Sequence, residues 1–194
     1  PHITIADTTA ICFTGPIFIM LGAAVFFREP MRWERWAGAG VGFAGVLIVV
    51  RPGQVELSFG ATLALLSALC MAAGSLLVKT LARTEPAPAI VAYMVIYLVP
   101  MSLVPALFVW QWPPLGAWPW LAVLGLFGAL AHLCYTRSLA AADASAVMPL
   151  DYLRLPVGAA MAYVFLFEVP TIYTWAGAGV IVASFVGATT AALL

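Results

Sequence analysis

The chain has 194 residues, of which 64% are hydrophobic and only 8% are charged, and its formal net charge is zero. Soluble domains carry about 25% charged residues, so eight basic and eight acidic side chains could not cover the surface of a soluble protein of this size. The composition therefore predicts an integral membrane protein. Zero net charge also removes the electrostatic argument for a nucleic-acid partner.

Apolar runs of about 20 residues, the length that a helix needs to cross a bilayer, recur along the whole chain. Seven such runs lie between charged or turn-forming clusters, and they predict an all-α bundle of seven transmembrane helices. In chain order the runs are Thr9–Phe27, Arg35–Val50, Ser58–Leu81, Pro88–Trp110, Ala117–Leu139, Ala144–Phe167 and Thr171–Ala192.

Basic residues are distributed unevenly over the connections between these runs. The second, fourth and sixth connections carry Arg51 alone, and Arg154 lies within a run. Because cytoplasmic connections are enriched in Lys and Arg, we expect the first, third and fifth connections and the C-terminus to be cytoplasmic. These three connections and the adjoining helix ends carry Arg28, Arg32, Arg35, Lys79, Arg83 and Arg137.

The hexapeptide WAGAGV occurs twice, at Trp36–Val41 on the second predicted helix and at Trp175–Val180 on the seventh. At the same offset Glu29 corresponds to Glu168, so the match indicates a diverged internal repeat. Five spans separate the two copies, and an odd number of spans inverts one copy relative to the other. We therefore expect two inverted five-helix repeats.

The repeat also predicts how the chain is divided. Residues 1–51 would be the last two helices of the first repeat, and residues 58–194 would be a complete second repeat. Three further helices would precede residue 1 in the intact protein. Small residues spaced four apart on the WAGAGV helices predict close helix packing, namely Gly38 with Gly42, and Gly179 with Ala183 and Gly187.

One stretch of the sixth run, MPLDYLRLP, combines charge with helix-breaking residues. Asp151 and Arg154 are three residues apart, so they share a helix face and can form an ion pair. Pro149 and Pro156 each remove a backbone donor, and free carbonyls inside a membrane are tolerated only beside protein or a watery cavity. Inverted repeats and broken helices are typical of secondary transporters. We expect the pair to line a transport pathway, with a structural ion pair as the alternative.

Other polar residues within the spans are weaker candidates. His132 has Tyr135 on nearly the same helix face and could relay protons or bind a substrate, or could simply pack. Ser75 lies one turn from Lys79, which we expect to extend to the cytoplasmic interface. Pro16 is expected to kink the first span, and Pro100 and Pro105 the fourth.

Three segments of the second repeat occur in a recognisable order: ADASAVMPLDYLRLP, an apolar run ending in Glu168, and TWAGAGVIVASFVG. The first repeat echoes them as ADTTAICFTGP, Glu29 and RWAGAGVGFAGVLIVVRPG. This order resembles the EamA-type branch of the drug/metabolite transporter superfamily. The family often has Gly directly before each of the two glutamates, whereas Arg28 and Phe167 stand there in this chain, which bears on the geometry of those helix ends.

The resemblance implies ten helices in two inverted repeats with cytoplasmic termini, and it makes the seven spans helices four to ten. It also implies a central path lined by helices four, six, eight and nine. The residues that this places near the path are Thr14, Ser75, His132, Tyr135, Asp151 and Arg154.

We interpret the chain as part of a secondary transporter that moves a small polar metabolite, an amino acid-like compound or a drug by alternating access. We expect it in the bacterial inner (plasma) membrane, with the lipid bilayer and a small-molecule substrate as partners and with no cofactor, metal or catalytic residue. A proton as coupling ion and a homodimer are left open.

Two alternatives remain. An intramembrane serine/histidine enzyme would use Ser75 and His132, but the sequence Ala73-Gly74-Ser75 lacks the Gly-x-Ser context of such a nucleophile. A scaffold without transport activity gives no reason for Asp151 and Arg154 inside the bilayer.

Overall fold

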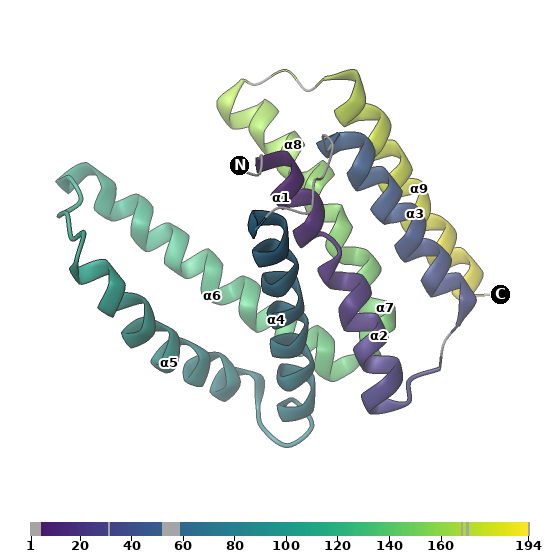
Figure 1. Ribbon diagram of the computed structural model, residues 1–194, viewed down its shortest axis with the longest axis horizontal. Helices are drawn as coiled ribbons and strands as arrows, with labels where there is room; N and C mark the ends of the chain where they lie inside the picture. Colours follow the sequence, from purple (N-terminus) through teal and green to yellow (C-terminus); the bar gives the residue numbers. More distant parts are fainter. Residues whose placement is uncertain (1–4, 31, 52–58, 168, 170, 194) are drawn as a thin grey trace. The chain divides into compact units, whose positions relative to one another are not determined.

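The computed structural model describes residues 5–30, 32–51, 59–167, 169 and 171–193, and its regular elements within these ranges are all helical (Figure 1). Glu168 and the predicted boundary between the repeats, residues 52–57, lie outside the described part. The elements are α1 (Ile5–Cys12), α2 (Gly15–Phe27), α3 (Trp33–Val50), α4 (Phe59–Leu81), α5 (Ala87–Leu107), η1 (Leu115–Ala117), α6 (Trp118–Ala141), α7 (Ala144–Val147), η2 (Met148–Leu153), α8 (Arg154–Leu166) and α9 (Ile172–Leu193).

Five helical stretches among the described residues are long and apolar enough to cross a membrane. They agree with the first five predicted spans to within a few residues at each end. The predicted sixth span is divided among α7, η2 and α8, and the seventh corresponds to α9. The all-helical class is confirmed, whereas the count of seven spans stays a prediction. The five stretches are Thr8–Phe27, Trp33–Val50, Phe59–Leu81, Ala87–Leu107 and Leu115–Ala141.

The chain divides by its internal contacts into two compact units. Leu77–Ala142 forms one unit, in which α5 packs against α6, and α5 keeps Pro100 and Pro105 inside a continuous helix.

Lys79 in this unit is buried, and its Nζ donates a hydrogen bond to the carbonyl of Ala142, 3.2 Å away, at the C-terminal end of α6. The partial negative charge of that helix C-terminus binds the ammonium group, and the interfacial position of Lys79 stays a prediction.

Pro1–Leu76 and Asp143–Leu194 form the other unit, in which α3 and α9 lie side by side and run in opposite directions (Figure 1). A Cβ added to Gly45 would lie 2.6 Å from Cγ1 of Ile181 and 3.0 Å from the carbonyl oxygen of Gly177. One turn further along α3, Val49 is the nearest neighbour of Gly177. This antiparallel contact is the orientation that the inverted repeat requires of the two WAGAGV helices, and superposition of the repeats stays a prediction.

The closest approach of α3 and α9 involves two glycines outside the predicted set, although Gly38 and Gly42 of that set are buried as well. Gly45 and Gly177 form it, whereas a Cβ on Gly179 would meet no heavy atom within 4 Å and Ala183 is exposed. Gly42 is also tightly packed, but against Tyr152. Gly residues occur on several faces of both helices, so spacing alone could not select the face that packs.

The helix ends before the two repeat glutamates adopt the same backbone conformation. Arg28 caps α2 at φ 52°, and Phe167 caps α8 at φ 54°. Both angles lie in the left-handed region that favours glycine. The helix-end geometry that a glycine would provide is therefore retained without one at both positions.

Candidate functional site

The first interrupted helix lies at the start of the chain. α1 ends at Cys12 and α2 begins at Gly15, so Phe13 and Thr14 separate two helices within one apolar stretch. Pro16 lies in the first turn of α2, where its missing N–H leaves no intrahelical hydrogen bond unmade. The Thr14 hydroxyl donates to the carbonyl of Ile11 at 2.6 Å, and the backbone N–H of Thr14 donates to the same carbonyl at 3.0 Å.

The second interruption lies in the MPLDYLRLP stretch. α7 ends at Val147, η2 continues as a 3₁₀ helix through Met148–Leu153, and α8 begins at Arg154. Pro149 lies in the first turn of this tighter segment, and Pro156 lies in the first turn of α8, so the irregular backbone ends before Pro156. A 3₁₀ stretch within a longer helix is a common feature of functional hinges.

The two interruptions meet inside the same compact unit, and we call this meeting point the helix-break crossing. It consists of Phe13 and Thr14 from the first break and Met148–Leu153 from the second. The rings of Phe13 and Tyr152 are stacked with centroids 6.2 Å apart, and Phe43 of α3 lies 6.5 Å from Tyr152. Tyr152 is completely buried, and η2 packs against α2, α3 and α9. The crossing is thus at the centre of this unit.

The predicted ion pair lies at the edge of the crossing. Nη1 of Arg154 is 3.7 Å from Oδ2 of Asp151, and the side chains are 51% and 35% exposed. The Arg154 guanidinium also lies 4.2 Å from the centroid of the Phe13 ring. The spacing of three residues therefore does bring the two charges together. Their partial exposure leaves both groups able to exchange partners.

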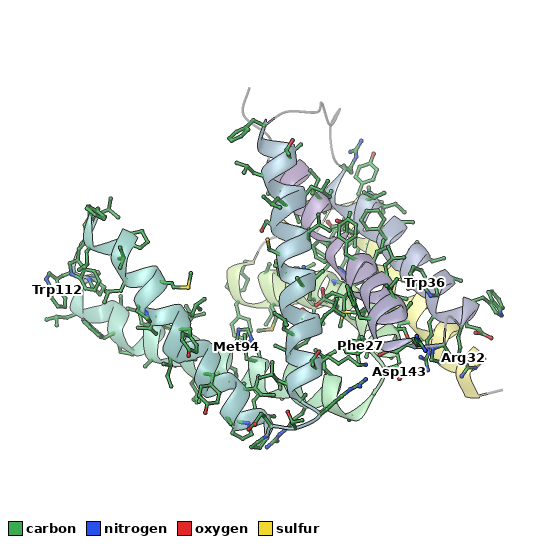
Figure 2. All side chains as sticks on the ribbon, turned by 60° about the horizontal axis from the view of Figure 1, so that its bottom comes forward. Phe27, Arg32, Trp36, Met94, Trp112 and Asp143 are labelled. Atoms are coloured by element: carbon green, nitrogen blue, oxygen red, sulfur yellow. The ribbon has the colours of Figure 1, made fainter. Side chains whose placement is uncertain are left out.

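A polar cluster, which we call the clasp, joins the end of α2 to the start of α7 (Figure 2). Both carboxylate oxygens of Glu29 accept hydrogen bonds from the backbone, Oε1 from the N–H of Ala144 at 3.2 Å and Oε2 from that of Ser145 at 3.1 Å. Nη1 of Arg35 lies 2.9 Å from Oδ2 of Asp143 and 2.8 Å from the Ser145 hydroxyl. Sequence reasoning identified Glu29 only as a repeat position and missed the clasp.

The remaining predicted site residues are placed individually. Ser75 lies in the same unit as the crossing, and its hydroxyl donates to the Met71 carbonyl at 3.0 Å within α4. His132 and Tyr135 lie on α6 in the other unit, with His132 exposed and Tyr135 half-buried. Of the predicted site residues, the structure pairs Asp151 with Arg154, and Arg154 contacts Phe13, the neighbour of Thr14 in the chain. Among the described residues no group of three or more His, Cys, Asp or Glu side chains is arranged to hold a metal ion.

Residues 58–190, more than half of the chain, match the EamA-like transporter family. The chain belongs to this family. Membership places it in the drug/metabolite transporter superfamily, as the order of its motifs predicted. A solved crystal structure superposes on this EamA chain with a TM-score of 0.83 at 19% sequence identity. The superposition covers 96% of this chain and 68% of the solved one, so the two share a fold.

Named relatives of this EamA chain are transporters of bacteria. A riboflavin transporter of Rhizobium johnstonii is 35% identical over 94% of this chain and 61% of its own length, and one of Vibrio cholerae is 32% identical over 90% and 59%. An S-adenosylmethionine uptake transporter of Rickettsia bellii is 28% identical over 92% and 61%. The chain spans about three fifths of the length of these relatives. Their names are those of transporters of small metabolites and not of enzymes, and together with the apolar helices they indicate an inner-membrane protein.

Proposed function

We propose that this chain forms most of a secondary transporter that moves a small metabolite by alternating access, with the substrate path at the helix-break crossing. The observation that carries the proposal is the contact between two interrupted helices, Phe13 of one against Tyr152 of the other. Secondary transporters of other folds build their substrate sites where discontinuous helices meet. Asp151 and Arg154 at its edge would contact the polar groups of the substrate.

The clasp would hold one end of this path closed. Glu29, after α2, and Arg35, at the start of α3, connect these helix ends to the start of α7, and the contacts are hydrogen bonds and one ion pair. Such contacts can open without disturbing an apolar core. Opening here, with closure at the opposite end, is the movement that alternating access needs. Thr14, Ser75, His132 and Tyr135 remain proposed lining residues.

Riboflavin is the substrate that we propose to test first, because the riboflavin transporters named above are at least 32% identical to this chain. S-adenosylmethionine is the second, from the relative of Rickettsia bellii. Both molecules carry a flat heteroaromatic ring and polar substituents.

The test is uptake of radiolabelled riboflavin and S-adenosylmethionine into liposomes that contain the full-length protein. We expect saturable, counterflow-stimulated uptake of one of them, with no chemical change in the labelled molecule. Liposomes without protein are the control. Labelled product that differs chemically from the substrate would favour the enzyme alternative, and no uptake by correctly inserted protein would favour the scaffold.

A further inference from the structure

The hydroxyl of Tyr152 is a buried polar group that lacks a hydrogen-bond partner among the described residues. The whole side chain is inaccessible to solvent. Leaving a hydroxyl unpaired in such surroundings costs about 1–3 kcal/mol. Phenylalanine would fill the same space without this cost, so the hydroxyl contributes nothing to the stability of the closed arrangement. A contact made in another conformation would give the hydroxyl a use.

The surroundings of Tyr152 indicate what the hydroxyl could meet there. Its ring stacks on Phe13 and lies near Phe43, and Gly42 leaves room for it, since a Cβ at that position would be 2.7 Å from the Tyr152 ring. The planar guanidinium of Arg154 contacts the same Phe13 ring. Aromatic rings and guanidinium groups both favour stacking on flat, polarisable ligands.

We propose that Tyr152 is a specificity-determining residue of the transport path, whose hydroxyl donates a hydrogen bond to a carbonyl or ring-nitrogen acceptor on a flat heteroaromatic substrate. The contact forms when the helix-break crossing opens, and the 3₁₀ segment η2 that carries Tyr152 supplies the flexibility for that movement. Phe13 and Arg154 then provide the stacking surface. This inference rests on the proposed transport function and names the substrate class of the same site.

The test compares the full-length protein with its Tyr152→Phe variant, using riboflavin as the probe. Three quantities are measured: riboflavin affinity from quenching of flavin fluorescence, the KM and kcat of riboflavin uptake, and the Tm without ligand. Tyr163→Phe is the matched control, because Tyr163 lies on α8 and is half exposed.

We expect Tyr152→Phe to weaken riboflavin affinity and raise KM by about 3- to 10-fold, the effect of losing one neutral hydrogen bond, while kcat stays unchanged. The Tm should stay the same or rise, because an unpaired hydroxyl is removed from the protein interior. Tyr163→Phe should match the wild-type protein in all three quantities.

The outcomes separate this inference from the proposed function. If the wild-type protein transports riboflavin and the Tyr152→Phe variant shows unchanged riboflavin affinity and KM, this inference alone is overturned. A lower Tm in Tyr152→Phe also overturns it, since the hydroxyl would then be paired in the closed state. If the wild-type protein transports S-adenosylmethionine but neither binds nor transports riboflavin, the proposed hydrogen bond to riboflavin is overturned. The proposed transport function then still stands. Wild-type protein that binds and transports neither molecule overturns both.

Discussion

Asp151 and Arg154 are partly exposed charged residues in an otherwise apolar stretch, and they are paired with each other. A charge that faces hydrocarbon costs about 2.5–3.5 kcal/mol on insertion scales, so pairing at the edge of the helix-break crossing avoids a substantial penalty. The additional contact of Arg154 with Phe13 connects the pair to the aromatic residues of the crossing. Substitution of either residue should therefore affect transport more than folding.

In the full-length protein we expect Asp151→Asn to reduce uptake by about tenfold, the effect of losing one charged interaction, at nearly normal membrane abundance. Arg154→Ala should be worse, because it removes the partner of Asp151 and the contact with Phe13 together. Initial uptake rates normalised to the amount of protein in the membrane measure both effects. Normal transport by both variants, or full activity restored by exchanging the two charges, would show that the pair is only structural.

Phe167 holds a left-handed backbone conformation that costs a non-glycine residue about 1–2 kcal/mol. We therefore expect Phe167→Gly to stabilise the protein by about 1 kcal/mol and to raise its Tm in detergent by about 2–4 °C. Phe165→Gly is the control, because Phe165 is also exposed but has a right-handed helical backbone in α8, and glycine there should lower the Tm. Equal shifts in both variants would contradict the assignment of strain to Phe167.

At the scale of elements, the pairing of α3 with α9 depends on glycines that let two backbones approach. A Cβ at Gly177 would lie 2.7 Å from the carbonyl oxygen of Gly45, and backbone atoms cannot move away as a flexible side chain can. We expect Gly45→Ala and Gly177→Ala each to destabilise the protein by about 1–3 kcal/mol, measured as a lower Tm. Gly40→Ala and Gly179→Ala should be neutral or stabilising, because no heavy atom lies within 4 Å of either new Cβ.

The clasp is the other contact between elements that can be tested directly. Glu29→Ala would leave the buried N–H groups of Ala144 and Ser145 without their carboxylate acceptor, at a cost of about 1.5–3 kcal/mol. Glu34→Ala is the matched control, because its carboxylate makes only a 3.7 Å pair with half-exposed Arg32 and should matter by less than about 1 kcal/mol. Thermal unfolding of both variants measures the difference, and a similar shift in each would show that the clasp adds no stability.

The elements also show what sequence can and cannot predict in this protein. The first five spans follow from the length of the apolar runs, because bilayer thickness fixes that length. The interruption at Pro149 follows from its missing N–H. The clasp could not be predicted, because Glu29 and Ser145 are 116 residues apart and only packing of the whole unit brings them together. The burial of Tyr152 was hidden for a related reason, since spans that are apolar on every side do not reveal which face is inside.

At the scale of the whole molecule, two contacts relate the connections between spans. The clasp joins Glu29, from the first connection, to the backbone of Ala144 and Ser145 at the start of α7. It also joins Arg35, at the start of α3, to Asp143 of the fifth connection. At the other end of α3, the Arg51 guanidinium lies 4.0 Å from the centroid of the Tyr173 ring, which is in the first turn of α9 and follows the sixth connection. The first contact thus lies beside the first and fifth connections, and the second lies beside the second and sixth. This is the pairing that a chain crossing the membrane once per predicted span requires.

That pairing gives a prediction of sidedness that does not depend on the substrate. In a variant without Cys12, Cys70 and Cys134, single cysteines at Arg32 and Arg83 should be protected from an impermeant thiol reagent added outside intact cells, and one at Gln111 should react. The reason is the excess of Lys and Arg at the odd connections, which keeps them in the cytoplasm. A permeant reagent that labels all three positions is the control for reactivity. Protection of Gln111 together with labelling of Arg32 and Arg83 would reverse the orientation, and labelling of all three positions from outside would contradict the alternation itself.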